Sequence, residues 1–348
     1  MPSSVPIGDF LNLANELPII DVRSPKEFAK GHIPGASNIE LFSDEERAMV
    51  GTIYKQVGKK EALDKAVELI DPKKNQLVLK AEELAPDKKA LVHCWRGGMR
   101  SERLATFLEM HGFESFVLEK GYKAYRQYIH AAFEKPVKLL VLGGMTGSGK
   151  TDVLQALGEL GEQILDLEHH ARHKGSSFGH IGQEEQPTTE QFENELGRLW
   201  IDMDMSKPIW VEDESKTIGT VHLPEALYKW IRSSPVIKLE LKFADRIKRL
   251  VRDYSVYDNE LLKQSILRIS KRLGDQNAVM ALEALEADEH ETVAEITLKY
   301  YDKAYSHGLS KRDHDTIFDV QLEADDPAKN AAVVKDFVYQ NLDRLWKK

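Results

Sequence analysis

The sequence has a single cysteine, Cys94, among 348 residues. One thiol excludes an intramolecular disulfide and fits a reducing compartment, so we expect a cytoplasmic location. No run approaches the roughly 18 apolar residues that span a membrane. The N-terminus also lacks the basic start and apolar core of a signal peptide, so no membrane partner is expected. Basic residues are in the minority, and the net charge of −9 argues against a generally basic nucleic-acid binder, although charge acts locally.

The length and the spacing of motifs indicate two domains. A chain of 348 residues is long enough for about two domains that each bury a core. A helix is expected near residues 121–133, and an apolar strand follows Pro136. We therefore predict one domain over residues 1–135 and a second over residues 136–348, with little linker between them.

Cys94 lies at the junction of a strand and a helix. An apolar strand ends at His93, and a helix is expected to begin near Ser101. Backbone N–H groups in such a loop, together with a helix N-terminus, lower a thiol pKa and bind an anion. A lone cysteine is ordinarily a small buried apolar residue, but this loop favours a nucleophile. The residues expected to bind the anion beside it are Arg96, Gly97, Gly98 and Arg100.

The spacing of this loop fits two kinds of cysteine chemistry. A His-Cys pair, five residues and then Arg100 and Ser101 is the arrangement of cysteine-dependent phosphatases. A cysteine loop with glycines after a strand is also typical of rhodanese sulfurtransferases, and segments 19–28 and 31–38 closely resemble rhodanese motifs. Arg100 is six residues after Cys94, whereas many simple sulfurtransferases have it five residues on. The wider loop suggests a tetrahedral ligand of phosphate size and leaves phosphatase chemistry open.

The second motif is a P-loop. The apolar segment 138–142 precedes the pattern Gly-x-x-x-x-Gly-Lys-Thr at residues 144–151, and apolar residues recur after it at helical spacing. Glycines let backbone amides surround a phosphate chain, the lysine reaches the outer oxygens, and the threonine hydroxyl can hold Mg²⁺. The motif leaves open whether ATP, GTP, a prenyl diphosphate or an RNA phosphate binds. The expected phosphate-binding residues are Gly144, Gly147, Gly149, Lys150 and Thr151.

Acidic residues follow another apolar strand of the second domain. Glu212, Asp213 and Glu214 come directly after it, and one of them could support Mg²⁺ through water. The sequence does not distinguish among the three, and local hydrogen bonds would explain them equally well. One arrangement that the sequence allows is a magnesium ion held by Thr151 and Asp213.

One stretch of the second domain is basic. Residues 236–274 carry ten Lys or Arg against five Asp or Glu. Arginines repeat at a spacing of three residues there, which places them near one helix face. This pattern fits contact with RNA phosphates, a lid over a phosphorylated ligand or a solvated face. The candidate RNA contacts, which become candidate tRNA contacts with the resemblance given next, are Arg246, Arg249, Arg252, Lys271 and Arg272.

A rhodanese domain with one cysteine, followed directly by a P-loop domain, resembles the tRNA 2-selenouridine synthase family over essentially the whole chain. Segments 93–101, 143–151 and 175–179 carry the resemblance, with further similarity in 186–193 and 210–219. Lys174 stands where the family usually has Arg. The resemblance implies an α/β fold, with a rhodanese-like parallel-sheet domain followed by a P-loop NTPase-like α/β domain.

The resemblance also implies a function. It is that of a transferase that converts wobble 2-thiouridine in tRNA into 2-selenouridine through an S-geranylated intermediate. The co-substrates would be selenophosphate, made by a selenophosphate-producing enzyme, and geranyl diphosphate, with no prosthetic group. Cys94 would attack selenium and carry it as a Cys–S–Se species. No aspartate-rich prenyl-diphosphate motif is present, so the geranyl diphosphate site is inferred from the P-loop alone.

Other functions remain open at this point. One is a cysteine-dependent phosphatase, or a thiosulfate sulfurtransferase, fused to a P-loop kinase-like domain. Another is a regulatory module in which both loops only hold anions. Phosphatases normally need a general acid for the leaving alcohol, and no carboxylate lies between Cys94 and Arg100. An anion-binding module would leave Cys94 without a purpose.

Overall fold

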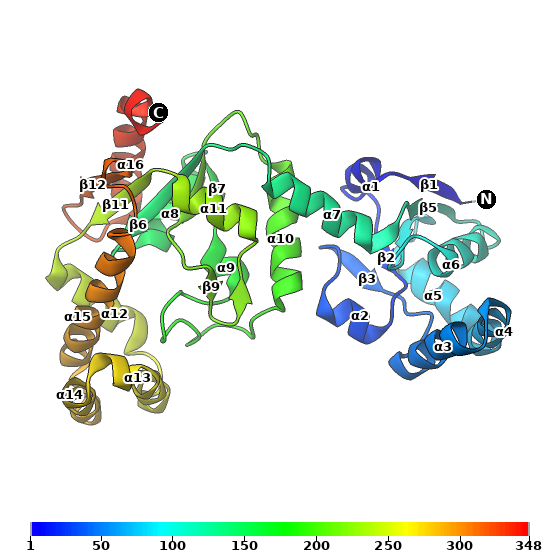
Figure 1. Ribbon diagram of the computed structural model, residues 1–348, viewed down its shortest axis with the longest axis horizontal. Helices are drawn as coiled ribbons and strands as arrows, with labels where there is room; N and C mark the ends of the chain where they lie inside the picture. Colours follow the sequence, from blue (N-terminus) through cyan, green and yellow to red (C-terminus); the bar gives the residue numbers. More distant parts are fainter. Residues whose placement is uncertain (1, 347–348) are drawn as a thin grey trace. The chain divides into compact units, whose positions relative to one another are not determined.

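The computed structural model describes residues 2–346 and divides into two compact units. The first runs to Ala132 and includes Glu193–Arg198, and the second takes Phe133–Phe192 and continues from Leu199. Each unit is built on a five-stranded parallel sheet with helices packed around it (Figure 1). The α/β class expected from the sequence is confirmed.

The sheet of the first unit has the strand order β1-β5-β4-β2-β3, and all its pairs are parallel. Its central strand β4 is buried over Ala90–His93 because those side chains face helices on both sides. The strands are β1 Ser3–Val5, β2 Ile19–Asp21, β3 Ala36–Asn38, β4 Lys89–His93 and β5 Glu114–Leu118. The helices are α1 Ile7–Leu13, α2 Pro25–Lys30, α3 Asp44–Gln56, α4 Lys59–Ile70, α5 Lys74–Leu84, α6 Met99–Glu109 and α7 Gly121–Phe133.

Helix α2 begins with residues suited to a helix start. Ser24 is its N-cap and Pro25 its first residue, and Glu27 completes a capping box with Ser24. The cap satisfies backbone N–H groups that a helix start otherwise leaves without partners. It also fixes Glu27 on the first turn of α2, from which its carboxylate reaches Arg100.

The sheet of the second unit has the order β12-β11-β6-β8-β7, again with parallel pairs. The central strand β6 is buried throughout. The strands are β6 Leu139–Gly144, β7 Gln163–Leu165, β8 Ile209–Glu212, β11 Val236–Glu240 and β12 Ile317–Gln321, with a hairpin of β9 Thr217–Ile218 and β10 Val221–His222. The helices are α8 Lys150–Glu159, α9 Leu167–Ala171, α10 Thr189–Asp202, α11 Glu225–Ser233, α12 Phe243–Tyr254, α13 Asn259–Leu273, α14 Asp275–Glu286, α15 His290–Leu309, α16 Pro327–Gln340 and α17 Leu342–Leu345.

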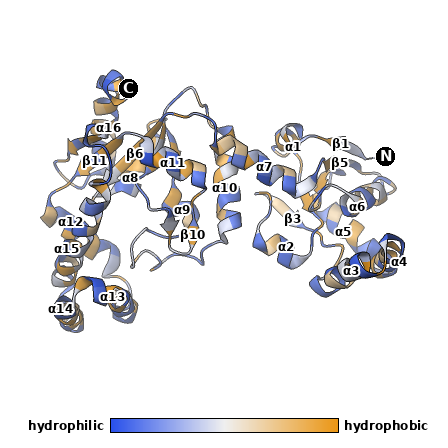
Figure 2. Ribbon diagram, in the orientation of Figure 1, coloured by the Kyte–Doolittle hydropathy of each residue, from blue (hydrophilic) through white to orange (hydrophobic). Residues whose placement is uncertain are grey.

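Four helices, α12–α15, lie between β11 and β12 in the sequence. They form a separate apolar cluster, in which Leu262 and Ile266 of α13 pack with Leu285 of α14 and Val293 of α15. Figure 2 shows hydrophobic strands in the sheet of this unit and mixed hydropathy along these helices. This helical insertion supplies one wall of the cavity described below.

Strand β7 ends at Leu165, because the Asp166 side chain accepts the His169 N–H and caps α9. One helix start differs from the sequence prediction. Helix α6 begins at Met99, two residues before the expected start at Ser101. Among residues 2–346, no helix combines the length and apolar character required to cross a bilayer.

Candidate active sites

Cys94 follows the central strand of the first sheet. The carboxyl ends of parallel strands are where open α/β sheets bind ligands. The side chain is 3% exposed, at the base of a loop that runs from β4 to the start of α6. The Gly98 N–H donates to Cys94 Sγ over 3.4 Å, and the Ser101 hydroxyl lies 3.2 Å from the same sulfur.

Two glycines allow the loop to fold back on the start of α7. Gly97 and Gly121 both have φ of +59°, a conformation that L side chains rarely adopt. A Cβ at Gly121 would lie 2.3 Å from the Cys94 carbonyl oxygen, and one at Gly97 would lie 2.4 Å from that of Leu118. The Tyr122 N–H donates to the Cys94 carbonyl over 2.8 Å. The start of α7 therefore holds the loop, and this role of Gly121 was missed from the sequence.

The loop favours the thiolate. Burial would raise the pKa of Cys94, but hydrogen bonds from Ser101 and Gly98 and the charge of Arg100 outweigh it, so the pKa lies below its ordinary value. Ser101 was predicted only as a helix start. Its hydroxyl also lies 3.0 Å from the Gly98 carbonyl and can donate to only one of the two acceptors at a time.

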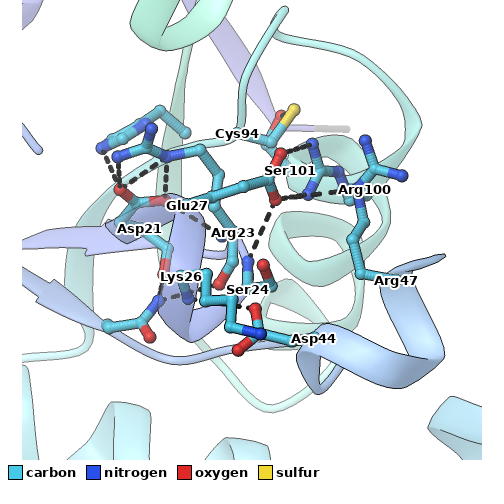
Figure 3. Close-up of polar contacts among 12 residues, drawn as sticks. Asp21, Arg23, Ser24, Lys26, Glu27, Asp44, Arg47, Cys94, Arg100 and Ser101 are labelled. Atoms are coloured by element: carbon cyan, nitrogen blue, oxygen red, sulfur yellow. Dashed lines mark hydrogen bonds and ion pairs between the residues drawn. The ribbon is translucent and has the colours of Figure 1, made fainter. Parts of the chain in front are cut away.

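The predicted anion-binding arginines differ in position. Arg96 is exposed on the loop. Arg100 is held by Glu27, with Nη1 2.8 Å from Oε2, and Arg47 Nε lies 3.6 Å from the same oxygen. In Figure 3 both guanidinium groups approach Glu27 beside Cys94. Glu27 therefore fixes Arg100 at the rim of the loop, and the capping-box spacing of Ser24 and Glu27 is only an indirect sign of this role in the sequence.

The second site is the P-loop at the carboxyl end of the central strand β6. Gly147 and Gly149 have φ of +78° and +79°, as the motif requires. Lys150 Nζ lies 3.1 Å from the Gly144 carbonyl, and Gly144 N–H donates to the Tyr305 hydroxyl over 2.8 Å. All five predicted phosphate-binding residues are thus brought together on this loop and the first turn of α8.

The arginines of α12 are not the exposed stripe that the sequence suggested. Arg246 and Arg249 are 3% and 7% exposed. Arg246 donates to the Thr146 carbonyl over 2.9 Å and pairs with Asp302 over 3.0 Å. Arg249 pairs with Asp152 and Asp325.

These contacts give the two arginines a different role from the predicted one. They connect α12 to the P-loop and the first turn of α8, and their charges are compensated by neighbouring carboxylates. The other three candidate tRNA contacts, Arg252, Lys271 and Arg272, are exposed.

Carboxyl groups gather next to the P-loop. The Thr151 hydroxyl donates to Glu168 over 2.7 Å, and Glu168 and Glu214 share a hydrogen bond. A Cβ on Gly175 would lie 2.9 Å from Glu214 and 3.0 Å from Glu168. Glycine at 175 therefore lets the chain pass close over both carboxyl groups.

The predicted magnesium ligands are each held by other side chains. Thr151 is bonded to Glu168, whereas Asp213 accepts from Arg312 over 2.6 Å and from the Tyr305 hydroxyl over 3.2 Å. Within the described part of the chain, no three His, Cys, Asp or Glu side chains are grouped so as to hold a metal ion. The Thr151–Asp213 pairing is therefore not supported, and we derive no step through a metal.

A cavity of about 560 Å³ opens from the P-loop. One wall is polar and carries Lys150, Thr151, Glu168 and Glu214. The helical insertion contributes apolar and aromatic lining residues, Leu250, Tyr254, Leu262, Val293, Ala294 and Tyr301, together with polar ones such as Asp253, His290 and Thr297. The cavity therefore joins the P-loop to a chamber lined in part by apolar side chains, called the apolar chamber below.

We expect the carboxyl groups of this cavity to affect stability with pH. Burial, followed by the charge of Glu168, raises the pKa of Glu214 to about 8. Because an unfolded Glu ionises near 4.5, the native state binds the extra proton between these values, and Glu214 lowers stability as pH rises from 4.5 to 8. Glu214→Gln should reduce this loss of stability and raise the free energy of unfolding by about 1 kcal/mol or more at pH 8. Thermal melting of both proteins from pH 5 to 8 measures the difference.

Glu159→Gln, at the exposed end of α8, is the matched control and should leave the pH dependence unchanged. The prediction would be contradicted if the melting temperatures of wild type and Glu214→Gln changed with pH in the same way.

Together, the two sheets and their loops define a two-part α/β enzyme with a rhodanese-like cysteine loop and a P-loop. Family models agree with this division. Residues 8–128 match the rhodanese-like domain, and residues 137–326 match the tRNA 2-selenouridine synthase AAA domain.

Three similar proteins are tRNA 2-selenouridine synthases. The Sulfurovum protein is 35% identical over 340 residues, which cover 91% of this chain and 92% of that one. The Shewanella piezotolerans protein is 35% identical over 344 residues, covering 88% and 92%. The Nitrosomonas europaea protein is 37% identical over 247 residues, and the match spans 69% of this chain and 64% of its relative. The chain belongs to the tRNA 2-selenouridine synthase family and is a tRNA-modifying transferase.

Proposed function

We propose that the chain replaces the sulfur of wobble 2-thiouridine by selenium in two stages. Geranyl diphosphate first alkylates the sulfur, which makes it a better leaving group. Selenium from selenophosphate, delivered by a selenophosphate-producing enzyme, then displaces geranylthiol in a step that needs Cys94. We place the reaction in the cytoplasm, where the single free thiol of the chain stays reduced.

The cavity beside the P-loop is the observation that carries the geranyl stage. Lys150 and the loop amides suit the diphosphate, while Leu262, Val293 and Tyr301 offer an apolar surface for a prenyl chain. If a nucleotide bound with its phosphates at the P-loop, its polar sugar would face this apolar surface. The chemistry of the lining therefore favours an apolar diphosphate over ATP or GTP.

Nucleoside mass spectrometry tests the function directly. The purified chain, incubated with 2-thiouridine tRNA and geranyl diphosphate, should yield S-geranyl-2-thiouridine, and addition of selenophosphate should convert it into 2-selenouridine. Release of thiosulfate-derived sulfur, or hydrolysis of a phosphate ester that depends on Cys94, would support the rival sulfurtransferase or phosphatase. Formation of 2-selenouridine without any geranylated species would contradict the two-stage route.

We further propose that tRNA phosphates contact the exposed basic residues of the helical insertion. Each phosphate contact releases counterions, so log affinity falls linearly with log salt concentration. Changing Arg252, Lys271 and Arg272 to Gln should weaken tRNA binding and flatten the slope by somewhat under one for each lost contact. Filter binding at about 50–300 mM salt measures the slope.

Lys229→Gln, an exposed change on α11 outside the helical insertion, serves as the control for a general charge effect. An unchanged slope in the triple variant would show that these three residues are only a solvated face.

A further inference from the structure

We propose that Cys94 attacks the phosphorus of selenophosphate rather than its selenium, and that selenium departs as hydroselenide. This deepens the proposed function, on which it rests for the identity of the donor. The loop then forms a phosphorylated cysteine, and the Cys–S–Se carrier implied by the family resemblance is not formed.

The electron count favours attack at phosphorus. If the thiolate bonded to selenium, the P–Se electron pair would stay on phosphorus, and the product would be phosphite. A Cys–S–Se species together with phosphate would need a two-electron oxidant, which the reaction does not include. The chain offers no second cysteine to supply one through a disulfide.

Attack at phosphorus balances without a further reagent. The Cys94 S–P bond forms as the P–Se bond breaks, and its electron pair leaves on selenium with the proton of monoprotonated selenophosphate. Water then cleaves the S–P bond, which gives inorganic phosphate and restores the thiol. Hydroselenide bonds to C2 of the geranylated base, its proton moves to N3, and geranylthiolate leaves.

The loop places phosphorus, not selenium, nearest the thiolate. Cys94 is buried at the base of the loop, beneath the Gly98 amide and beside Arg100 at the rim. Loop amides and a guanidinium group bind the oxygens of an oxyanion. When the phosphate oxygens occupy those donors, the central phosphorus faces Sγ and the P–Se bond points out of the loop.

Among residues 2–346, the groups that bond to or act on the Cys94 thiol are Gly98, Ser101 and Arg100, none of which is an acid suited to an alcohol leaving group, and this fits a selenide. Burial would raise the pKa of Glu27, but Arg100, the Ser24 amide and Arg47 together outweigh burial and bring the pKa below its ordinary value. This carboxyl is therefore ionised and cannot donate a proton. Hydroselenide is a weak base and leaves without protonation. A phosphatase-like loop with no general acid is therefore suited to P–Se cleavage.

Ser101 acts as a positioning residue in both steps. Its hydroxyl, 3.2 Å from Sγ, stabilises negative charge on sulfur before the attack and again when sulfur leaves phosphorus. Because sulfur loses charge in the first step and gains it in the second, Ser101→Ala should slow the second step more than the first and increase the amount of phosphorylated Cys94. A purely structural role would instead lower both steps together, without accumulation.

A single-turnover experiment tests the proposal with the full chain and selenophosphate, without oxygen, tRNA or geranyl diphosphate. After an acid-free quench, the peptide that contains Cys94 is analysed by ³²P labelling from labelled selenophosphate and by mass spectrometry. The phosphoryl and selenium adducts differ little in mass, so the isotope pattern of selenium distinguishes them. We expect a phosphorus-bearing adduct without selenium, hydroselenide trapped by an alkylating reagent, and phosphate as the phosphorus product.

Three results would overturn the proposal. They are a selenium-bearing adduct on Cys94, phosphite among the products, and equal rates of P–Se cleavage by wild type and Cys94→Ser. Failure of geranylation or tRNA binding leaves this readout unchanged, because neither partner is present. Formation of 2-selenouridine from a donor other than selenophosphate would instead contradict the proposed function.

Discussion

Replacing Cys94 with serine should abolish formation of 2-selenouridine, with a loss of at least about 1,000-fold, as is usual when a catalytic nucleophile is removed. The thiolate is the only one the chain can form, and a serine hydroxyl in the same loop stays protonated at neutral pH. Nucleoside mass spectrometry on tRNA incubated with geranyl diphosphate and selenophosphate provides the measurement.

The same variant should still make S-geranyl-2-thiouridine, since the P-loop cavity contains no part of the Cys94 loop. Accumulation of the geranylated nucleoside is therefore the expected positive signal, and it also controls for folding and tRNA binding. Normal amounts of 2-selenouridine from Cys94→Ser would refute the role of the thiol.

Changing Lys150 to alanine should instead impair the first stage, S-geranylation. A charge-assisted hydrogen bond from an ammonium group to a phosphate oxygen is worth roughly 1.5–3 kcal/mol, or about ten- to hundredfold in affinity. We expect this loss in the Kd for geranyl diphosphate and a matching fall in S-geranylation. Calorimetric titrations with geranyl diphosphate, ATP and GTP measure which ligand depends on Lys150.

Lys229→Ala, an exposed change on α11, provides the matched control. P–Se cleavage at Cys94 should be unchanged in Lys150→Ala, because that reaction uses the other loop. If all three ligands bound Lys150→Ala as they bind wild type while geranylated tRNA still formed, the P-loop would have another purpose.

Local patterns predicted the two loops well, for a physical reason. Much of the conformation of each loop depends on residues within it, such as Gly97 in the Cys94 loop and Gly147 and Gly149 in the P-loop, whose φ is positive. The helices and strands beside these loops were predicted to within one to three residues. Motif spacing is therefore sufficient where the structure is local.

Long-range contacts could not be predicted in the same way. The spacing of Arg246 and Arg249 correctly placed them on a helix, but nothing local showed that this helix packs on a P-loop about 100 residues earlier. Gly121 and Glu27 likewise act on the Cys94 loop from distant positions. The sequence did not distinguish Asp213 from Glu214 as a magnesium ligand, whereas the structure shows that Asp213 pairs with Arg312.

The long separation between β11 and β12 has a consequence for the order of folding. These strands pair in register from Val236 and Ile317 onward, but residues 241–316 lie between them. Closing so long a segment is costly in chain entropy, and distant pairings form slowly. We expect the β6–α8 segment to acquire its turn early, while the apolar chamber is completed only when β12 docks. A newly made chain would thus form its P-loop before the apolar chamber of the cavity is complete.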